Sequence, residues 1–339
     1  LINTYPKSPH RLEAYLILGD AAFDNGDLGG AERNYNAVLS APDSHVHPLA
    51  RYKLGWVRVN KEDCKGAVGF FEKILRDKAT PRGEQKLVAT QRSLNIHREA
   101  LVDLAYCYPD VYPDKPAGPY LKTLADNSSD YLAAMRRVAK RFFVKELYGQ
   151  AAAALREVLG GTVYDDGAIE DARKLYDSVI KSKGLEFAAD DVERFGRVWE
   201  QRAYNWRVPK DKRDKLAVEM ETYARDVATK AQEVARERKS PSLRVQAAAA
   251  YGAYLAWFPS SDKQLEMEQN HADALVHSTE KALAEHGDIK GGRGGHGRVS
   301  RNNPPFCPND RPAAGGLPGR PAGGRARIVP MRGNGTTKV

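Results

Sequence analysis

The sequence predicts an all-α protein built from stacked helical pairs, and three observations support this fold class. The 339 residues are 42% hydrophobic and rich in Ala, Leu, Lys and Glu, which suits a helical array better than a compact α/β enzyme. Segment 12–43 holds two short stretches with apolar residues at helical spacing, divided by a turn at 25–27. Similar pairs recur along the chain. Because so short a pair cannot bury its own apolar faces, we expect neighbouring pairs to share one core.

The repeat unit carries a small residue in its first helix and three apolar residues at fixed distances after it. In the first copy Gly19 is followed by Ala31, Tyr35 and Val38, at offsets of 12, 16 and 19 residues. Small side chains at 19 and 31 let two helix backbones approach closely. The same offsets recur in three further copies: Gly55 with Ala67, Phe71 and Ile74; Ala105 with Ala117, Leu121 and Leu124; and Ala139 with Ala151, Leu155 and Val158.

This unit resembles the tetratricopeptide repeat (TPR) family. The small residues are separated by 36, 50 and 34 positions, and the family period is about 34 residues. The resemblance covers residues 1–159, as a TPR array of four recognisable repeats plus the end of a preceding one. It implies a right-handed α-α superhelix, a TPR-like solenoid. The wide middle separation contains an insertion at 80–97, which is either a lengthened helix or a surface loop.

Prolines distinguish the third repeat from the others. Pro109 and Pro113 lie where its first helix should end, and each removes a backbone donor and disfavours helix before it. We therefore expect that first helix to be truncated. Segment 126–129 reads Asp-Asn-Ser-Ser, which predicts a helix stop and the cap of the fourth repeat.

Beyond residue 160 the pattern weakens, and 160–286 is predicted to be a degenerate TPR-like helical region. Ala172, Tyr176 and Val179 fit the second helix of a repeat whose partner is shortened. A long helix is expected near 212–239, with apolar residues at nearly heptad spacing. That spacing fits one packed face of a solenoid helix or a coiled-coil seam. A helix from Gln264 begins one more repeat.

Two junctions carry a further resemblance. Residues 5–8 read Tyr-Pro-Lys-Ser and residues 258–261 read Phe-Pro-Ser-Ser, each before an expected helix. They resemble junctions in TPR proteins of bacterial envelopes, in particular the large periplasmic TPR proteins of gliding deltaproteobacteria. The resemblance implies a bacterial periplasm or cell envelope, with the cytoplasm as the alternative. The chain opens on Leu1 rather than Met, so we expect a fragment or a processed product.

The three cysteines, Cys64, Cys107 and Cys307, are too few and too scattered to predict a disulfide framework or a zinc site. Cys64 and Cys107 are therefore expected to be packing residues. No run approaches the length of apolar sequence that a membrane helix requires.

The positive charge is concentrated at the C-terminal end. Residues 287–339 carry a net charge of +8 out of the total of +9, so the helical body has no general bias toward nucleic acid. This Gly/Arg/Pro-rich stretch lacks apolar periodicity and is predicted to be a disordered tail. A frame change or junction, an inert tail, and an Arg-Gly nucleic-acid-binding tail all stay open. Since Phe306 is its only aromatic residue, there is little to stack on bases.

Residue patterns for catalysis are absent from the sequence, and we expect no enzyme activity and no cofactor. There is no phosphate loop, no G-x-S-x-G and no HExxH. His45 and His47 lie in a turn and are expected to be solvated, since a metal site needs three or four ligands. Asp165-Asp166 and Asp190-Asp191 are interpreted as helix-start signals before acid/base pairs.

In TPR arrays the first helix of each repeat lines a concave groove, and the resemblance implies a protein-binding groove here. Trp56 directly follows Gly55 and is the expected anchor, because large aromatic residues often anchor a bound chain. Each aromatic residue can instead pack against a neighbouring helix. Arg136 and Lys140 would favour an acidic partner. The expected groove residues are Phe23, Tyr52, Trp56, Tyr106, Arg136, Lys140 and Phe143.

The sequence therefore predicts a non-enzymatic scaffold that binds peptide or helix segments of partner proteins, in a bacterial envelope or motility complex. The alternative is a nucleic-acid-associated helical scaffold that uses the basic tail, although nucleic acid is not the expected partner. A sensor array linked to an upstream enzyme domain is a third class. Chaperone-tail clamps use Lys, Asn and Arg on this helix face, where this chain has Leu16, Asp20, Tyr52 and Trp56, so a clamp of that kind is not expected.

Overall fold

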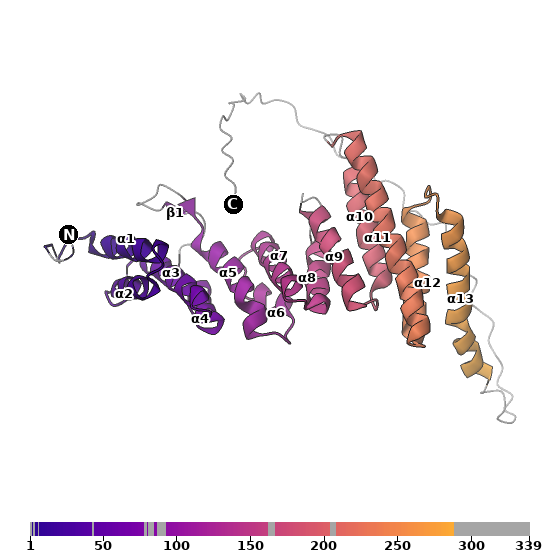
Figure 1. Cartoon of the computed structure of the whole chain (residues 1–339), viewed down its shortest axis with the longest axis horizontal. Coiled ribbons are helices and arrows are strands. Elements are labelled where there is room, and N and C mark those ends of the chain that lie inside the picture. The colour runs from indigo at the N-terminus through magenta and orange to yellow at the C-terminus, as the bar shows by residue number, and fades with distance from the viewer. Residues whose placement is uncertain are drawn as a thin grey trace, which may run out of the picture. The chain divides into compact units, whose positions relative to one another are not determined.

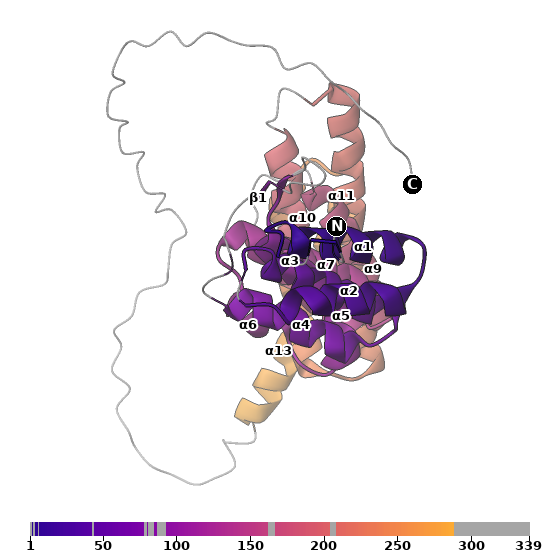
Figure 2. The same ribbon diagram turned by 90° about the vertical axis from the view of Figure 1, so that its left-hand side faces the viewer.

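The protein is an α-solenoid in which each helix packs against the next along the chain (Figure 1). The computed structural model describes residues 2, 4, 5, 7–42, 44–77, 80, 85, 86, 93–161, 167–203 and 208–287. Its helices are α1 (Arg11–Asp24), α2 (Leu28–Leu39), α3 (His47–Asn60), α4 (Cys64–Arg76), α5 (Ile96–Val111), α6 (Ala117–Lys122), α7 (Ser128–Val144), α8 (Tyr148–Gly161), α9 (Ala168–Ser182), α10 (Ala188–Ala203), α11 (Lys210–Glu237), α12 (Pro241–Trp257) and α13 (Gln264–Gly287). Figure 2 looks along this row from the side of α1.

The predicted small residues lie where two helices of a pair come closest. A Cβ atom on Gly19 would be 2.4 Å from Cε1 of Tyr35, and one on Gly55 would be 2.4 Å from Cε1 of Phe71. Both rings are fully buried. The offset of 16 residues therefore marks an aromatic ring of the second helix resting on a glycine of the first. A larger residue at either glycine would have to displace the ring.

Helix starts follow from side-chain caps. Asp27 and Asp63 begin α2 and α4 by accepting the backbone N–H groups of Gly30 and Gly66, at 2.7 and 2.8 Å. Asn127 caps α7 in the same way, accepting the N–H of Asp130 at 2.9 Å, within the segment where the sequence predicts a cap. These side chains satisfy donors that the first helical turn leaves without a partner.

The expected truncation of the first helix in the third repeat is wrong. Helix α5 runs through Pro109 to Val111 and is 16 residues long. Pro109 lies in the last turn of α5. Because proline lacks a backbone N–H, one helical hydrogen bond is missing there, but only two helical residues follow it, so the cost to the helix is small. The short element is the second helix of that repeat, α6, which has only six residues.

The insertion at 80–97 includes a short β pairing. Strands β1 (Gln85–Lys86) and β2 (Ser93–Leu94) are antiparallel, with Gln85 opposite Leu94. Asn95 then caps α5 by accepting the N–H of Arg98 at 3.0 Å. The choice between a longer helix and a loop is thus settled against the longer helix, since α4 ends at Arg76.

Helices α9 to α13 continue the packing beyond residue 160. The long helix expected near 212–239 corresponds to α11, which packs against both α10 and α12. Met220, Val227, Ala231 and Val234 are fully buried in the same core, as expected of one packed face of a solenoid helix. The tail predicted at 287–339 lies outside the described residues, apart from Gly287 at the end of α13. Among the described helices, none is both long and apolar enough to cross a membrane.

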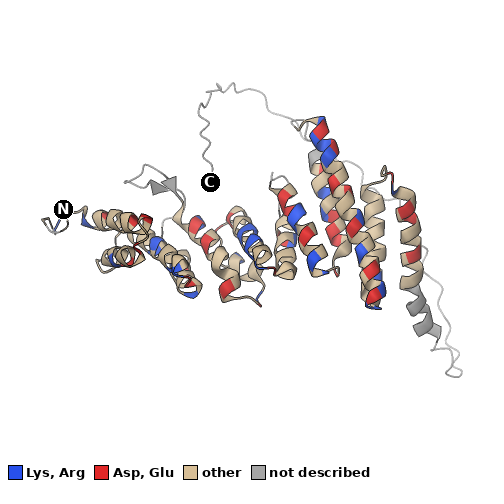
Figure 3. Cartoon of the chain, viewed as in Figure 1, with Lys and Arg blue, Asp and Glu red and all other residues tan. Residues whose placement is uncertain are grey.

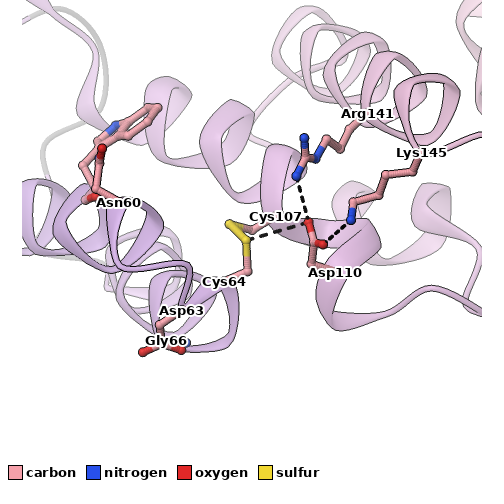
Figure 4. The surroundings of a disulfide bond; sticks show 9 residues. Asn60, Asp63, Cys64, Gly66, Cys107, Asp110, Arg141 and Lys145 are labelled. Carbon is pink, nitrogen blue, oxygen red and sulfur yellow. Dashed lines mark hydrogen bonds and ion pairs between the residues drawn. A yellow bond between two sulfur atoms is a disulfide. The ribbon is translucent and has the colours of Figure 1, made fainter.

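The expectation that Cys64 and Cys107 are only packing residues is wrong. They form a disulfide that joins the first residue of α4 to α5, with the Cα atoms 5.2 Å apart (Figure 4). Spacing along the sequence could not reveal this pair, because the two cysteines are 43 positions apart. Cys107 is also fully buried in the core, so it packs as well as cross-links.

Candidate protein-binding face

The predicted groove residues lie on the odd-numbered helices, along a side of α1, α3, α5, α7 and α9 that we call the odd-helix face. Phe23 on α1 packs against a smaller core cluster formed by α1, α2 and α3. Tyr52, Trp56, Tyr106 and Phe143 are partly buried against the main core cluster. Each of these last four side chains also contacts a residue on another element.

Asp103 of α5 connects two predicted residues of α3. The Tyr52 hydroxyl and the Trp56 indole N–H both donate to its Oδ2 atom, at 2.7 and 2.9 Å. The residue is 7% exposed, and this burial raises the pKa of the Asp103 carboxyl above its ordinary value, against the lowering effect of the two donors and of Arg137. Tyr52 and Trp56 therefore link two repeats, in addition to any role in binding.

Tyr106 lies under two arginines of the next odd helix. The guanidinium carbons of Arg137 and Arg141 are 5.0 and 4.4 Å from the centre of its ring. Positive charge over an aromatic face is favourable, and arginine is the usual cation in such contacts. The predicted aromatic residue on α5 therefore lies beside a strongly basic part of α7.

The other predicted residues, Arg136, Lys140 and Phe143, all lie on α7. Arg136 donates from Nε to Asp171 of α9 at 2.7 Å, and Phe143 packs edge-on against Tyr148. The ammonium of Lys181 on α9 lies 4.9 Å from the centres of both of those rings. Lys140 is exposed. Because residues 137 and 141 face α5 whereas 136 and 143 face α9, Lys140 lies in the middle of the exposed side of α7.

Charge alternates along the odd helices from α1 to α7 (Figure 3), whereas α9 has three basic and three acidic residues. Helices α1 and α5 each have one arginine and three acidic residues. Helix α3 has three basic residues and no acidic one, and α7 has four basic residues and one acidic one. Ion pairs follow this alternation: Asp20 with Lys53, Asp110 with Arg141, and Arg136 with Asp171. Opposite charge on neighbouring helices favours this stacking order over others.

Three cations near α7 are left over from these pairs. Among the described residues, Arg137, Lys140 and Lys181 form no ion pair. Two of them lie over aromatic rings, and the third is exposed. We call these three residues the basic strip. It can accept carboxylates from another molecule without first breaking an internal salt bridge.

The histidines and acidic pairs that the sequence offers as candidates for metal binding or catalysis either have structural roles or lie outside the described residues. His47 is buried at the start of α3, with Nε2 3.0 Å from the carbonyl oxygen of Val38, so its expected solvation is wrong. Asp191 is fully buried and binds Arg156, whereas Asp165 and Asp166 lie outside the described residues. In the part of the chain that is described, no three His, Cys, Asp or Glu residues are grouped as metal ligands.

Sequence reasoning missed the partners of the predicted residues. Asp103, Arg137 and Lys181 received no role, although each lies on an odd helix near a predicted residue. The available signal was the alternating charge of the odd helices, which can be counted in the sequence. The sequence does not show which of these charges face each other and which stay unpaired.

Comparison with known families gives no match to any family model, and comparison with curated proteins gives no match either.

Proposed function

We propose that this chain is a non-enzymatic, TPR-type scaffold that binds an acidic segment of a partner protein along its odd-helix face. The observation that carries the proposal is the basic strip of Arg137, Lys140 and Lys181. Elsewhere on this face, ion pairs join adjacent odd helices, as between Asp20 and Lys53 and between Asp110 and Arg141. At α7 positive charge remains in excess beside the aromatic residues Tyr106 and Phe143.

The chemistry of the strip selects the partner class. Carboxylates can pair with the three cations, and an apolar side chain between them can rest on the half-buried rings. Complementary charge would mainly increase the association rate and the discrimination against other partners. Nucleic acid fits less well, since α1 and α5 are acidic and would repel a phosphate backbone that continued along the face.

A direct test uses a defined probe. A fluorescein-labelled peptide of alternating Asp and Glu around one Phe should bind the full chain, and its Lys-substituted counterpart should not. Lys140→Glu reverses an exposed charge and should weaken binding about tenfold, a change of about 1.4 kcal/mol, without altering the melting temperature. Lys212→Glu, an exposed position on α11, is the matched control. Equal binding by wild type and Lys140→Glu would refute the proposed site.

We also propose a bacterial periplasm or envelope as the compartment, and the disulfide supports it. Disulfides persist in oxidising compartments and are rare in the cytosol. Blocking free thiols in intact source cells, followed by labelling of the denatured protein with and without reduction, checks this. Two additional cysteines should become reactive after reduction, and an unchanged number would favour the cytoplasm.

A further inference from the structure

Two hollows lie beside the connection that leads into the short helix α6. It has six residues, whereas its neighbours α4 and α8 have 13 and 14. One hollow, of about 970 Å³, lies between α4 and the connection at 110–115. Another, of about 360 Å³, lies between α6 and α8. Asp114 and Lys115 line both hollows, so together they make one surface that we call the α6 cleft.

The smaller hollow is mostly apolar. Met135 and Phe142, both members of the main core, form its base. Its walls include Gly149 and Ala153 of α8, where little or no side chain fills the space. A Cβ atom added at Gly149 would meet nothing within 4 Å. The hollow can therefore receive one large apolar side chain from outside.

The surroundings of the cleft are acidic. Six acidic residues and two lysines line the two hollows. Asp63, Glu72 and Asp110 have arginine partners, with Asp110 held 3.4 Å from Arg141 (Figure 4). In the described part of the chain, the other three, Glu62, Asp114 and Glu157, form no ion pair.

The cleft already stabilises one cation of its own. The ammonium of Lys115 lies 5.1 Å from the centre of the Tyr112 ring, and Tyr112 also lines the larger hollow. An aromatic face next to unpaired carboxylates is a favourable place for a lysine or arginine. A positively charged segment thus finds both kinds of contact there, whereas anionic lipid or nucleic acid would be repelled.

We propose that the α6 cleft is a second docking site, which binds a basic segment of a partner protein that carries one large apolar residue. The apolar side chain enters the hollow between α6 and α8 over Phe142. Flanking lysine or arginine residues pair with Asp114, Glu157 and Glu62. The cleft is lined mainly by α4, α6, α8 and the connection between α5 and α6, with Met135 and Phe142 of α7 at its base. It contains none of the three residues of the basic strip and selects the opposite charge, so it does not depend on the function proposed above.

Fluorescence anisotropy with two labelled peptides and one unlabelled competitor tests the proposal on the full chain. The probe Arg-Lys-Phe-Lys-Arg should bind at least about tenfold more tightly than Arg-Lys-Ser-Lys-Arg, because burial of a Phe side chain is worth a factor of that order. An excess of Glu-Asp-Phe-Asp-Glu should not displace the labelled Phe probe, because its charge is opposite. Lys140→Glu on the odd-helix face should leave the binding of the Phe probe unchanged.

Two variants locate the site, each with a matched control. Gly149→Trp fills the hollow and should reduce binding of the Phe probe to that of the Ser probe, whereas Gly160→Trp, at another open glycine of α8, should have no effect. Asp114→Lys should weaken both basic probes severalfold, and Asp262→Lys, in the exposed connection after α12, should not. Equal binding of the Phe and Ser probes, or unchanged binding to Gly149→Trp, would overturn the proposal.

Discussion

A covalent bond joins one pair of helices, α4 and α5, and a buried ion pair joins another pair farther along the chain, α8 and α10. Between α4 and α5 the disulfide Cys64–Cys107 spans two helices that also pack through apolar side chains. Between α8 and α10, Arg156 donates from Nε and Nη2 to the two carboxylate oxygens of Asp191, at 2.8 and 2.6 Å. Asp191 has no exposed surface. The two joints hold neighbouring repeats by different chemistry.

This difference shows what each joint responds to. The disulfide is insensitive to pH near neutrality but can be removed by a reductant, since it depends on the redox state. The ion pair is insensitive to reductant, but each partner depends on the other, because a buried charge without its counterion is very costly. Apolar packing surrounds both joints and depends on neither redox state nor charge.

The largest effect is expected from breaking the ion pair. Arg156→Ala leaves Asp191 buried without its main partner and should destabilise the protein by about 3–5 kcal/mol. Urea unfolding followed by circular dichroism measures the change. The double variant Arg156→Met with Asp191→Leu should recover most of the loss, because it also removes the unpaired charge. If the double variant is as unstable as the single one, the site depends on shape rather than on charge.

The next largest effect is expected from removing the disulfide. Cys64→Ala with Cys107→Ala should lower stability by about 2–4 kcal/mol, because the unfolded chain regains the freedom lost in a loop of this size. Dithiothreitol should destabilise the wild type by a similar amount and leave the double variant unchanged. If dithiothreitol leaves the wild-type unfolding curve unchanged, the disulfide contributes nothing to stability.

Apolar packing between α3 and α4, next to the disulfide joint, is expected to give a smaller effect whose sign depends on the position changed. Gly55→Ala puts a Cβ atom 2.4 Å from the Phe71 ring and should cost about 1–3 kcal/mol through overpacking. Gly69→Ala on α4, where a Cβ meets nothing within 4 Å, should instead gain about 0.5–1 kcal/mol from helix propensity. Thermal melts of the two variants should therefore shift in opposite directions. Shifts of the same sign would count against a close glycine–ring contact.

The smallest effect concerns pH. Since burial raises the pKa of Asp103 above its ordinary value of 3.8, the folded state holds this proton more tightly than the unfolded state. Its contribution to stability is therefore fully present below pH 3.8 and is lost as pH rises through the folded-state pKa. Asp103→Asn still offers an oxygen to Tyr52 and Trp56 but does not titrate. Measured from acid to neutral pH, the variant should gain stability relative to wild type; a constant difference would contradict the shift.

Much of the fold could be predicted from the sequence alone. The offsets after Gly19 and Gly55 indicate which aromatic ring rests on which glycine, because both residues belong to the same helical pair and are close in the chain. The cap at Asn127 is local in the same way. The failure at α5 was also local: the prolines disfavour helix, but Pro109 falls in a last turn where the penalty is small.

For the candidate sites too, the sequence predicts local features, whereas tertiary structure decides the contacts between distant residues. The sequence placed Tyr106, Lys140 and Phe143 on odd helices, since helical periodicity fixes the face on which a side chain lies. Tertiary structure decided that Asp103 holds Tyr52 and Trp56, that Cys64 meets Cys107, and that Lys140 stays exposed. It also decided that a cleft lies beside the short helix α6. These facts depend on contacts between residues far apart in the chain, and periodicity within one helix carries no information about which neighbouring helix a side chain will meet.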